Sequence, residues 1–348
     1  METEDQYRDY LRAVQKLLIM LRVLLVCVVL GVFMLFLKYK GEGPPNFFTR
    51  TDKVSTDSVL VIKDSMWVAP DTAKWVDEPL LAKIRYGRDL IVNTAKYLGP
   101  NAKIKHRSNG MNCQNCHLDA GTKIFGNNYG SVASTYPKFR ERSGSMESIP
   151  KRINDCFRRS LNGDAIDTAG KEMLAMVAYI KWLGKDVAKG TRAKGSGLKE
   201  LPYMDRAASP EQGEKLFKLK CISCHQANGA GKMRDDVPRY QYPPLWGENS
   251  YNSGAGLYRL ARFASFIKYN MPQGARYTNP QLSDEEAWDL AAYVNSQTRP
   301  AMDLSKDWPN IQHKPVDHPF GPYADTFTEN THKYGPFKPI KEFYAKTK

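Results

Sequence analysis

The chain has 348 residues, of which 42% are hydrophobic and 25% charged, so it has the length for two or three modest domains and the apolar content for their cores. With this composition, intrinsic disorder is not the default expectation for the chain. The formal net charge of +14 favours an anionic partner, such as nucleic acid, an anionic membrane, an acidic protein or a small anion. With six cysteines in all, the chain is not a disulfide scaffold.

An apolar segment lies near the N-terminus. Residues 17–37 carry a single charge, Arg22, and as a helix they would span about 31 Å, enough for the hydrocarbon core of a bilayer. No small-residue cleavage site follows, so we expect a cytoplasmic N-terminus at 1–16 and a transmembrane signal anchor at 17–37 that contains Cys27. The alternative is a cleaved signal peptide. Residues 38–75 are expected to form a spacer, with one short strand around Val59–Ile62.

Two C-x-x-C-H motifs follow, at Cys113–His117 and Cys221–His225. Two thiols three positions apart can form thioethers to the vinyl groups of one haem, and the adjacent histidine then supplies an axial ligand to the iron. The sequence therefore predicts two covalently bound c-type haems. The thioether-forming residues would be Cys113, Cys116, Cys221 and Cys224, and the axial histidines His117 and His225. Because c-type haem is attached outside the cytoplasm, we expect a single-pass protein of the inner membrane whose haem domains face the periplasm.

Helical patterns flank each motif. Ser209 is the expected N-cap of a helix that runs into Cys221, and Ser283 with Glu286 forms an expected capping box for a closing helix. Residues 80–98 and 171–183 repeat this plan more loosely around the first motif, with residues 178–180 aligned to 292–294. We therefore predict a mostly α fold with two cytochrome c-like domains in tandem. Their expected bounds are 76–190 and 209–299, joined by a basic, Gly-rich linker at 191–208.

The C-terminal segment, residues 300–348, has seven prolines and no helix-length periodicity. It is expected to wrap across both domains as irregular structure. Its expected anchors are Trp308, Phe320, Tyr323 and Phe337, and its histidines, with an expected role in surface or interdomain contacts, are His313, His318 and His332.

Residue types alone leave more than one option for each remaining axial ligand. Cys156 is an unpaired cysteine with arginines close by in the sequence, so it is either a buried small hydrophobe or a thiolate ligand of the first haem. In the second half, Met271 precedes a proline and is favoured over Met233 as the distal ligand. Lys268 is an alternative ligand if its pKa is depressed, and an exposed charge if it is not.

Several stretches resemble the dihaem thiosulfate dehydrogenases, above all the block RINDCFRRSLNG at Arg152–Gly163. The spacing from His117 to Cys156 also fits. The stretch 136–144 also resembles the family closely, further matches lie at 268–271, 302–309, 315–325 and 332–337, and the resemblance covers roughly residues 75–340.

The resemblance implies a catalytic first haem with His117 and Cys156 as ligands, and a second haem, with Met271 or Lys268 as distal ligand, that passes electrons on. It implies an enzyme that joins two thiosulfates into tetrathionate, releases two electrons, and in some members runs in reverse. It also implies that Arg142, Arg152 and Ser160 bind the substrate, with Arg159 a weaker candidate, because arginine forks suit sulfonate oxygens.

Cys156 would also act as a nucleophile that forms an S-thiosulfonate with the first thiosulfate, from which the second displaces tetrathionate. The expected electron partner is a c-type cytochrome or a membrane redox complex.

Two alternatives remain open. One is a membrane-anchored dihaem electron-transfer cytochrome without its own substrate, which would not need Cys156. The other is a sulfur-oxidising cytochrome acting on a carrier-bound sulfur chain. Nucleic acid is not an expected partner, because the haem domains would lie outside the cytoplasm.

Overall fold

The computed structural model describes residues 2–39, 65–71, 79–102, 108–236 and 239–347. Its contacts divide the chain into two units, Met1–Lys63 and Asp64–Lys348. In the described part of the first unit, helix α1 runs from Glu2 to Tyr39. Residues Val14–Gly31 of this helix have a mean hydropathy of 2.2, so it is long and apolar enough to cross a membrane. A signal sequence has the same properties. The expected strand at Val59–Ile62 lies outside the described residues.

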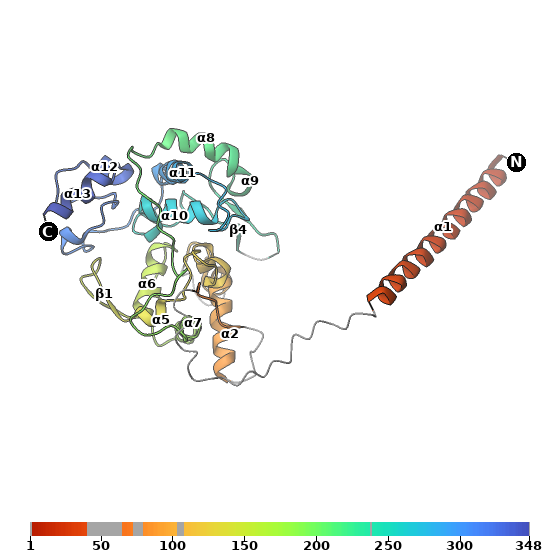
Figure 1. Cartoon of the computed structure of the whole chain (residues 1–348), viewed down its shortest axis with the longest axis horizontal. Helices are drawn as coiled ribbons and strands as arrows, with labels where there is room; N and C mark the ends of the chain where they lie inside the picture. Colours follow the sequence, from red (N-terminus) through yellow and green to blue (C-terminus); the bar gives the residue numbers. More distant parts are fainter. Residues whose placement is uncertain (1, 40–64, 72–78, 103–107, 237–238, 348) are drawn as a thin grey trace. The chain divides into compact units, whose positions relative to one another are not determined.

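The second unit begins with the first cytochrome c domain (Figure 1). Its elements are α2 (Pro79–Val92), α3 (Thr94–Leu98), η3 (Cys113–Asn115), α4 (Leu118–Gly121), α5 (Val132–Thr135), β1 (Lys138–Arg140), β2 (Ser145–Glu147), α6 (Ile149–Arg159) and α7 (Lys171–Leu183). The expected helix at 80–98 is therefore interrupted at Asn93, whereas α7 has the predicted bounds. Strands β1 and β2 form an antiparallel hairpin in which Lys138 pairs with Glu147.

The second cytochrome c domain follows with the predicted order of a helix, the haem motif, loops and a closing helix. Its elements are α8 (Pro210–Lys220), α9 (Ile222–His225), β3 (Lys232–Met233), β4 (Tyr240–Tyr242), η4 (Gly256–Tyr258), α10 (Leu260–Asn270) and α11 (Asp284–Ser296). The Ser209 hydroxyl accepts a hydrogen bond from the Gln212 backbone N–H, and Ser283 forms the capping box with Glu286. Both cap predictions are confirmed.

Each of the two domains contains an equivalent crossing of two helices. In the first, α2 packs against α7, and in the second, α8 packs against α11. A Cβ at Gly87 would lie 2.0 Å from the carbonyl oxygen of Ala175, and a Cβ at Gly213 would lie 1.9 Å from that of Asp289. Each crossing is thus closer than any residue with a side chain allows. This equivalence supports the internal duplication inferred from the sequence.

The C-terminal segment is not wholly irregular, so that part of the prediction was wrong. It contains η5 (Ile311–His313), α12 (Glu329–Tyr334) and α13 (Lys338–Lys346). Thr328 caps α12, and α13 carries its proline in the first turn, where a missing N–H costs nothing. Ile340 is fully buried in the core of the second domain and holds α13 in place.

The two domains are joined through their cores. Tyr251, Ala255 and Tyr258, which follow the second haem motif in sequence, are buried in the core of the first domain. Trp67, which the sequence placed in a spacer, belongs to the same core and is 8% exposed. The first haem motif therefore lies in a domain whose interior is completed by the second.

Candidate functional site: two haem sites and a cluster of arginines

The second haem motif borders a cavity of about 540 Å³, a size suited to a cofactor. Cys221, Cys224 and His225 lie on its wall together with Met271. Its apolar lining includes Phe217, Leu245, Phe263, Phe266, Ile267, Leu290 and Val294. Two thiols, an imidazole, a thioether and an apolar wall fit a c-type haem.

Backbone contacts orient the histidine of this motif. His225 Nδ1 lies 2.9 Å from the carbonyl oxygen of Pro243, and burial lowers the pKa of the imidazole. A neutral ring that donates through Nδ1 leaves Nε2 free as a metal ligand.

The ammonium of Lys268 contacts protein groups outside the cavity. Its ammonium donates to the carbonyl oxygen of Leu282 at 2.6 Å and lies 2.7 Å from Asp284 Oδ1. The side chain is nearly buried and does not line the cavity, whereas Met271 does.

The first haem motif is held in a similar way. The backbone N–H of Cys113 donates to Thr94 Oγ1 at 3.0 Å, and the Thr94 hydroxyl lies 3.3 Å from Cys113 Sγ. His117 Nδ1 lies 2.5 Å from the carbonyl oxygen of Asn127, and its ring stacks on Tyr129 with centroids 4.4 Å apart. Burial is the main cause that lowers the pKa of His117 to about 4, so the imidazole is neutral and Nε2 is available to iron.

Cys156 lies next to this motif. It is a partly buried, unpaired thiol on α6, a helix that Ser148 caps. Burial raises the pKa of Cys116 to about 12, and negative charge on Cys156 contributes to that rise, so the two sulfurs share one environment. The same charge contributes to the raised pKa of Cys113. The structure thus brings Cys113, Cys116, His117 and Cys156 together.

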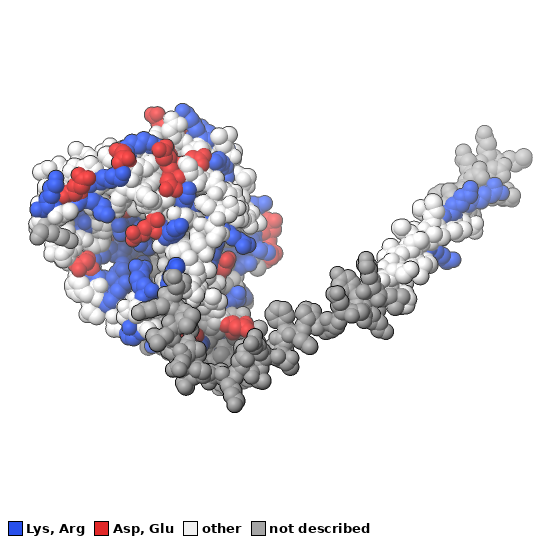
Figure 2. All heavy atoms as spheres, viewed as in Figure 1, with Lys and Arg blue, Asp and Glu red and all other residues white. Residues whose placement is uncertain are grey.

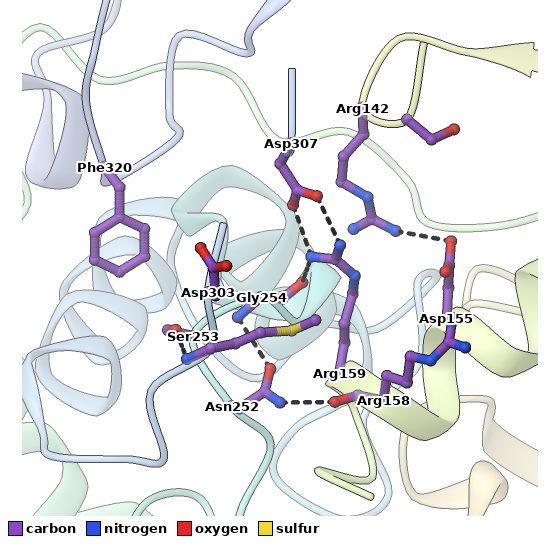
Figure 3. A network of polar contacts seen from close by, with 12 residues as sticks. Arg142, Asp155, Arg158, Arg159, Asn252, Ser253, Gly254, Asp303, Asp307 and Phe320 are labelled. Atoms are coloured by element: carbon purple, nitrogen blue, oxygen red, sulfur yellow. Dashed lines mark hydrogen bonds and ion pairs between the residues drawn. The ribbon is translucent and has the colours of Figure 1, made fainter. Parts of the chain in front are cut away.

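The arginines around Cys156 fall into two kinds. Arg152 lies one helical turn before it, and negative charge on Cys156 is the main cause that raises the pKa of the Arg152 guanidinium. Among the described residues, the Arg152 guanidinium makes no hydrogen bond or ion pair. Arg159 instead makes two 2.7 Å hydrogen bonds to Asp307 and one of 3.3 Å to the carbonyl oxygen of Gly254 (Figure 3).

The guanidinium of Arg142 is only partly paired, so it is intermediate between Arg152 and Arg159. One guanidinium nitrogen is 3.6 Å from Asp155, which is too long for a hydrogen bond, and that buried nitrogen has no hydrogen-bond partner among the described residues (Figure 3). Burial, followed by the charges of Arg152 and Arg159, lowers the pKa of Arg142 to about 10. Ser160 follows α6, and its backbone N–H donates to the carbonyl oxygen of Cys156 at 2.8 Å. The four residues expected to serve the substrate, Arg142, Arg152, Cys156 and Ser160, thus lie on or beside one helix.

Comparison with known proteins agrees with this architecture. Residues 103–188 match the family described as SoxA/TsdA, cytochrome c domain, and residues 210–298 match the family described as cytochrome c. The chain is 39% identical over 244 residues to a thiosulfate dehydrogenase of Psychrobacter arcticus, an alignment that covers 69% of this chain and 71% of the relative. The chain belongs to the thiosulfate dehydrogenase family.

Further members of the thiosulfate dehydrogenase family show the same relation. A thiosulfate dehydrogenase of Allochromatium vinosum is 39% identical over 196 residues, covering 55% of this chain and 71% of its own. The solved thiosulfate dehydrogenase (TsdBA) of Marichromatium purpuratum matches with a TM-score of 0.63 and 32% identity, over 68% of this chain and 50% of that chain. The predictions of two cytochrome c domains and two c-type haems are confirmed.

Sequence analysis missed one cation of this site. Arg262 lies on α10 of the second domain, yet its positive charge contributes to the low pKa of His117 in the first. Burial, Arg259 and Arg152 lower the pKa of Arg262 to about 10. A single arginine in a mostly apolar helix gives no local signal that its charge acts on the other domain.

Proposed function

We propose that this protein is a thiosulfate dehydrogenase that joins two thiosulfate ions into tetrathionate, in a reaction that can also run in reverse. Its relatives at 39% identity carry that activity in their names. The observation that carries the proposal is the unpaired thiol of Cys156, which lies beside the first haem motif and next to Arg152. A plain electron carrier has no need of a thiol or of an unpaired arginine there.

The chain offers two sets of haem-binding residues. The first haem would be held by Cys113, Cys116, His117 and Cys156, and the second by Cys221, Cys224, His225 and Met271. When bound, each haem would take up one electron at a time. Since Lys268 is engaged by Leu282 and Asp284, the thioether of Met271 is the better distal ligand. Cys116 lines the cavity that contains Cys221 and Cys224, which supports direct electron passage between the sites.

Cys156 would form the covalent intermediate. Its sulfur bonds to the outer sulfur of one thiosulfate, giving a cysteine S-thiosulfonate, as two electrons leave for the haems and any thiol proton goes to solvent. The outer sulfur of a second thiosulfate then attacks the adduct at the sulfur bonded to Cys156, which is the former outer sulfur of the first thiosulfate. This step breaks the bond to Cys156, releases tetrathionate and returns the cysteine as thiolate, with no further electrons exchanged.

The arginines would balance the charge of the substrates. Two thiosulfates bring four negative charges together, and this repulsion must be offset where the sulfur–sulfur bond forms. Arg152 and Arg142 have guanidinium nitrogens without protein hydrogen-bond partners among the described residues, and such forks match sulfonate oxygens. The hydroxyl of Ser160, beside the end of α6, would donate a further hydrogen bond.

We also propose that α1 anchors the chain in the inner membrane and that both haem domains face the periplasm. The apolar segment Val14–Gly31 supports an exported protein, and the lack of a small-residue cleavage site in the sequence favours an anchor over a cleaved signal. Electrons would then pass to a c-type cytochrome or to a membrane redox complex.

A two-way assay on the detergent-solubilised full chain tests the activity. We expect thiosulfate to reduce both haems and to yield one tetrathionate per two electrons, and tetrathionate to reoxidise the reduced protein. An electron carrier would accept electrons from a chemical reductant but form no tetrathionate. An enzyme for carrier-bound sulfur chains would act on that carrier and leave free thiosulfate unchanged.

A further inference from the structure

The helix that carries Cys156 is held at its end by a residue of the second domain. A helix leaves its last four carbonyl groups without partners inside the helix. In α6 the carbonyl oxygens of Cys156 and Phe157 accept from backbone N–H groups of the chain that follows, at 2.8–2.9 Å. Asn252 Nδ2 donates to the carbonyl oxygen of Arg158 at 2.7 Å (Figure 3), and the Asn252 backbone N–H donates to that of Arg159 at 3.0 Å. Two of the four terminal carbonyls are therefore paired by Asn252.

Every polar atom of the Asn252 side chain is used in this contact. The residue is 3% exposed. Its Nδ2 also donates to Asn162 Oδ1 at 2.9 Å, and its Oδ1 accepts from the backbone N–H of Gly254 at 3.0 Å. Asn162 lies in the turn after α6 and has a φ of 41°, in the left-handed region that asparagine tolerates better than most residues. The amide of Asn252 thus joins the last turn of α6 to the turn that follows it.

The loop that contains this asparagine, residues 250–255, contacts both domains. A second contact with α6 comes from the guanidinium of Arg159, which donates to the carbonyl oxygen of Gly254 at 3.3 Å (Figure 3). On the side of the second domain, the hydroxyl of Tyr251 donates to Asn295 Oδ1 on α11 at 3.2 Å. The loop therefore links the helix of the first haem site to the closing helix of the second domain.

Helix α6 is basic and lies in a basic neighbourhood. Arg158 and Arg159 occupy its last turn, and Lys151 and Arg152 lie in its first half, against one acidic residue, Asp155. Figure 2 shows Lys and Arg side chains gathered in a hollow on the side of this unit that carries β1 and α6 in Figure 1. An added carboxylate would hold the helix but lower the positive charge of a site proposed to bind anions. A neutral amide holds the helix without that loss.

We propose that Asn252 is a positioning residue for Cys156, so that the thiol is held at the first haem site only when the loop of the second domain is packed against α6. Arg159 lies three positions after Cys156, about 4.5 Å along the helix axis, so a shift of the last turn also moves the thiol. A reacting group displaced by about 1 Å can cost about a hundredfold in rate. The inference rests on the role of Cys156 as haem ligand and nucleophile proposed above.

The test uses Asn252→Leu in the full, haem-loaded chain, because leucine is similar in size to asparagine and has no side-chain donor or acceptor. Asn295→Leu is the matched control. Asn295 is also 3% exposed and also binds the loop and its continuation, but its side chain does so through Tyr251 and Tyr258 rather than through α6. Asn252→Ala serves if Asn252→Leu does not fold, as judged by haem content and circular dichroism.

Electron paramagnetic resonance of the oxidised, thiosulfate-free protein reports the ligand of the first haem, with Cys156→Gly as the reference without a thiolate. The kcat for tetrathionate formation is measured in parallel. We expect the signal of Asn252→Leu to shift toward that of Cys156→Gly and its kcat to fall by about tenfold or more. Asn295→Leu should keep the wild-type signal and a kcat within about twofold of wild type.

A wild-type signal in both Asn252→Leu and Asn252→Ala overturns the proposal, whatever their kcat. Equal changes in Asn252→Leu and Asn295→Leu overturn it as well, because the stability of the loop alone would then explain them. Identical signals in the wild type and Cys156→Gly would refute the ligand role of Cys156 and this inference with it. Failure of the wild type to form tetrathionate would refute the proposed function alone, since the signal is read without substrate.

Discussion

The two cytochrome c domains have the same helix crossing and the same haem motif but differ on the side of the haem opposite the motif histidine. In the second domain, Met271 lines an apolar cavity, and the nearest lysine on α10, Lys268, is neutralised by Asp284. In the first, Cys156 lies beside Arg152, which has no carboxylate within ion-pair distance among the described residues.

This difference teaches how one fold supports two roles. An apolar pocket with paired charges changes little when an electron arrives, which suits electron transfer. Guanidinium groups without hydrogen-bond partners beside a thiol attract anions, which suits a sulfur dianion as substrate. The substitutions that follow test whether the two sites differ in this way.

Replacing Cys156 should have the largest effect. We expect Cys156→Gly to reduce tetrathionate formation by about a thousandfold or more, because the proposed nucleophile and axial ligand are lost together. Both haems should remain attached, since the four thioether cysteines are unchanged. The measurement is the tetrathionate yield together with the haem content of the purified protein. Cys27→Ser is the matched control, and a wild-type rate in Cys156→Gly would refute the covalent mechanism.

Replacing Arg152 comes next. Arg152→Gln should lower kcat/KM for thiosulfate by about a hundredfold, the usual cost of losing one donor at a site of concentrated negative charge. Lys181→Gln removes a charge from the same domain without touching the site, so it should leave kcat/KM unchanged. Equal effects of the two variants in steady-state assays would mean that only net charge matters, and the contrast between the domains would lose its basis.

A third substitution addresses the second domain. Met271→Ala should lower the midpoint potential of the second haem, because a thioether ligand favours the reduced iron, while KM for thiosulfate stays within about twofold of wild type. Redox titration with absorption spectroscopy checks this. Lys268→Gln and Met233→Leu should leave the potential unchanged. A drop in either of those variants, and none in Met271→Ala, would assign the distal ligand to the other residue.

The sequence predicted what depends on local chemistry. The haem motifs, the caps at Ser209 and Ser283 and the bounds of α7 all follow from spacing and residue type within a few positions. It missed α13 because prolines were taken as signs of irregular structure, although a proline in the first turn begins a helix.

Contacts between residues far apart in the chain could not be predicted from the sequence. Nothing near Lys268 in the sequence indicates that Leu282 and Asp284 bind its ammonium. Arg159 and Arg152 look alike in one short block of sequence, yet the partner that distinguishes them, Asp307, is 148 positions away from Arg159.

Replacing Arg159, whose guanidinium is already bound by Asp307, should have the smallest effect on activity. Arg159 and Asp307 are joined by two 2.7 Å hydrogen bonds with side chains 11% and 10% exposed, so they connect the C-terminal segment to α6. Arg159→Gln leaves a nearly buried carboxylate without its partner and should lower the free energy of unfolding by about 3 kcal/mol. Its kcat/KM should fall far less than that of Arg152→Gln, because the guanidinium of Arg159 is already occupied.

Denaturant unfolding of Arg159→Gln, Asp307→Asn and the double variant measures this pair directly. We expect the double variant to be less destabilised than the sum of the single ones, as for residues that interact. If Arg159→Gln unfolds like the wild type but loses as much kcat/KM as Arg152→Gln, Arg159 binds substrate. The set of substrate-binding arginines beside Cys156 then includes Arg159 at the end of α6, and the first domain differs from the second by one more substrate-binding charge.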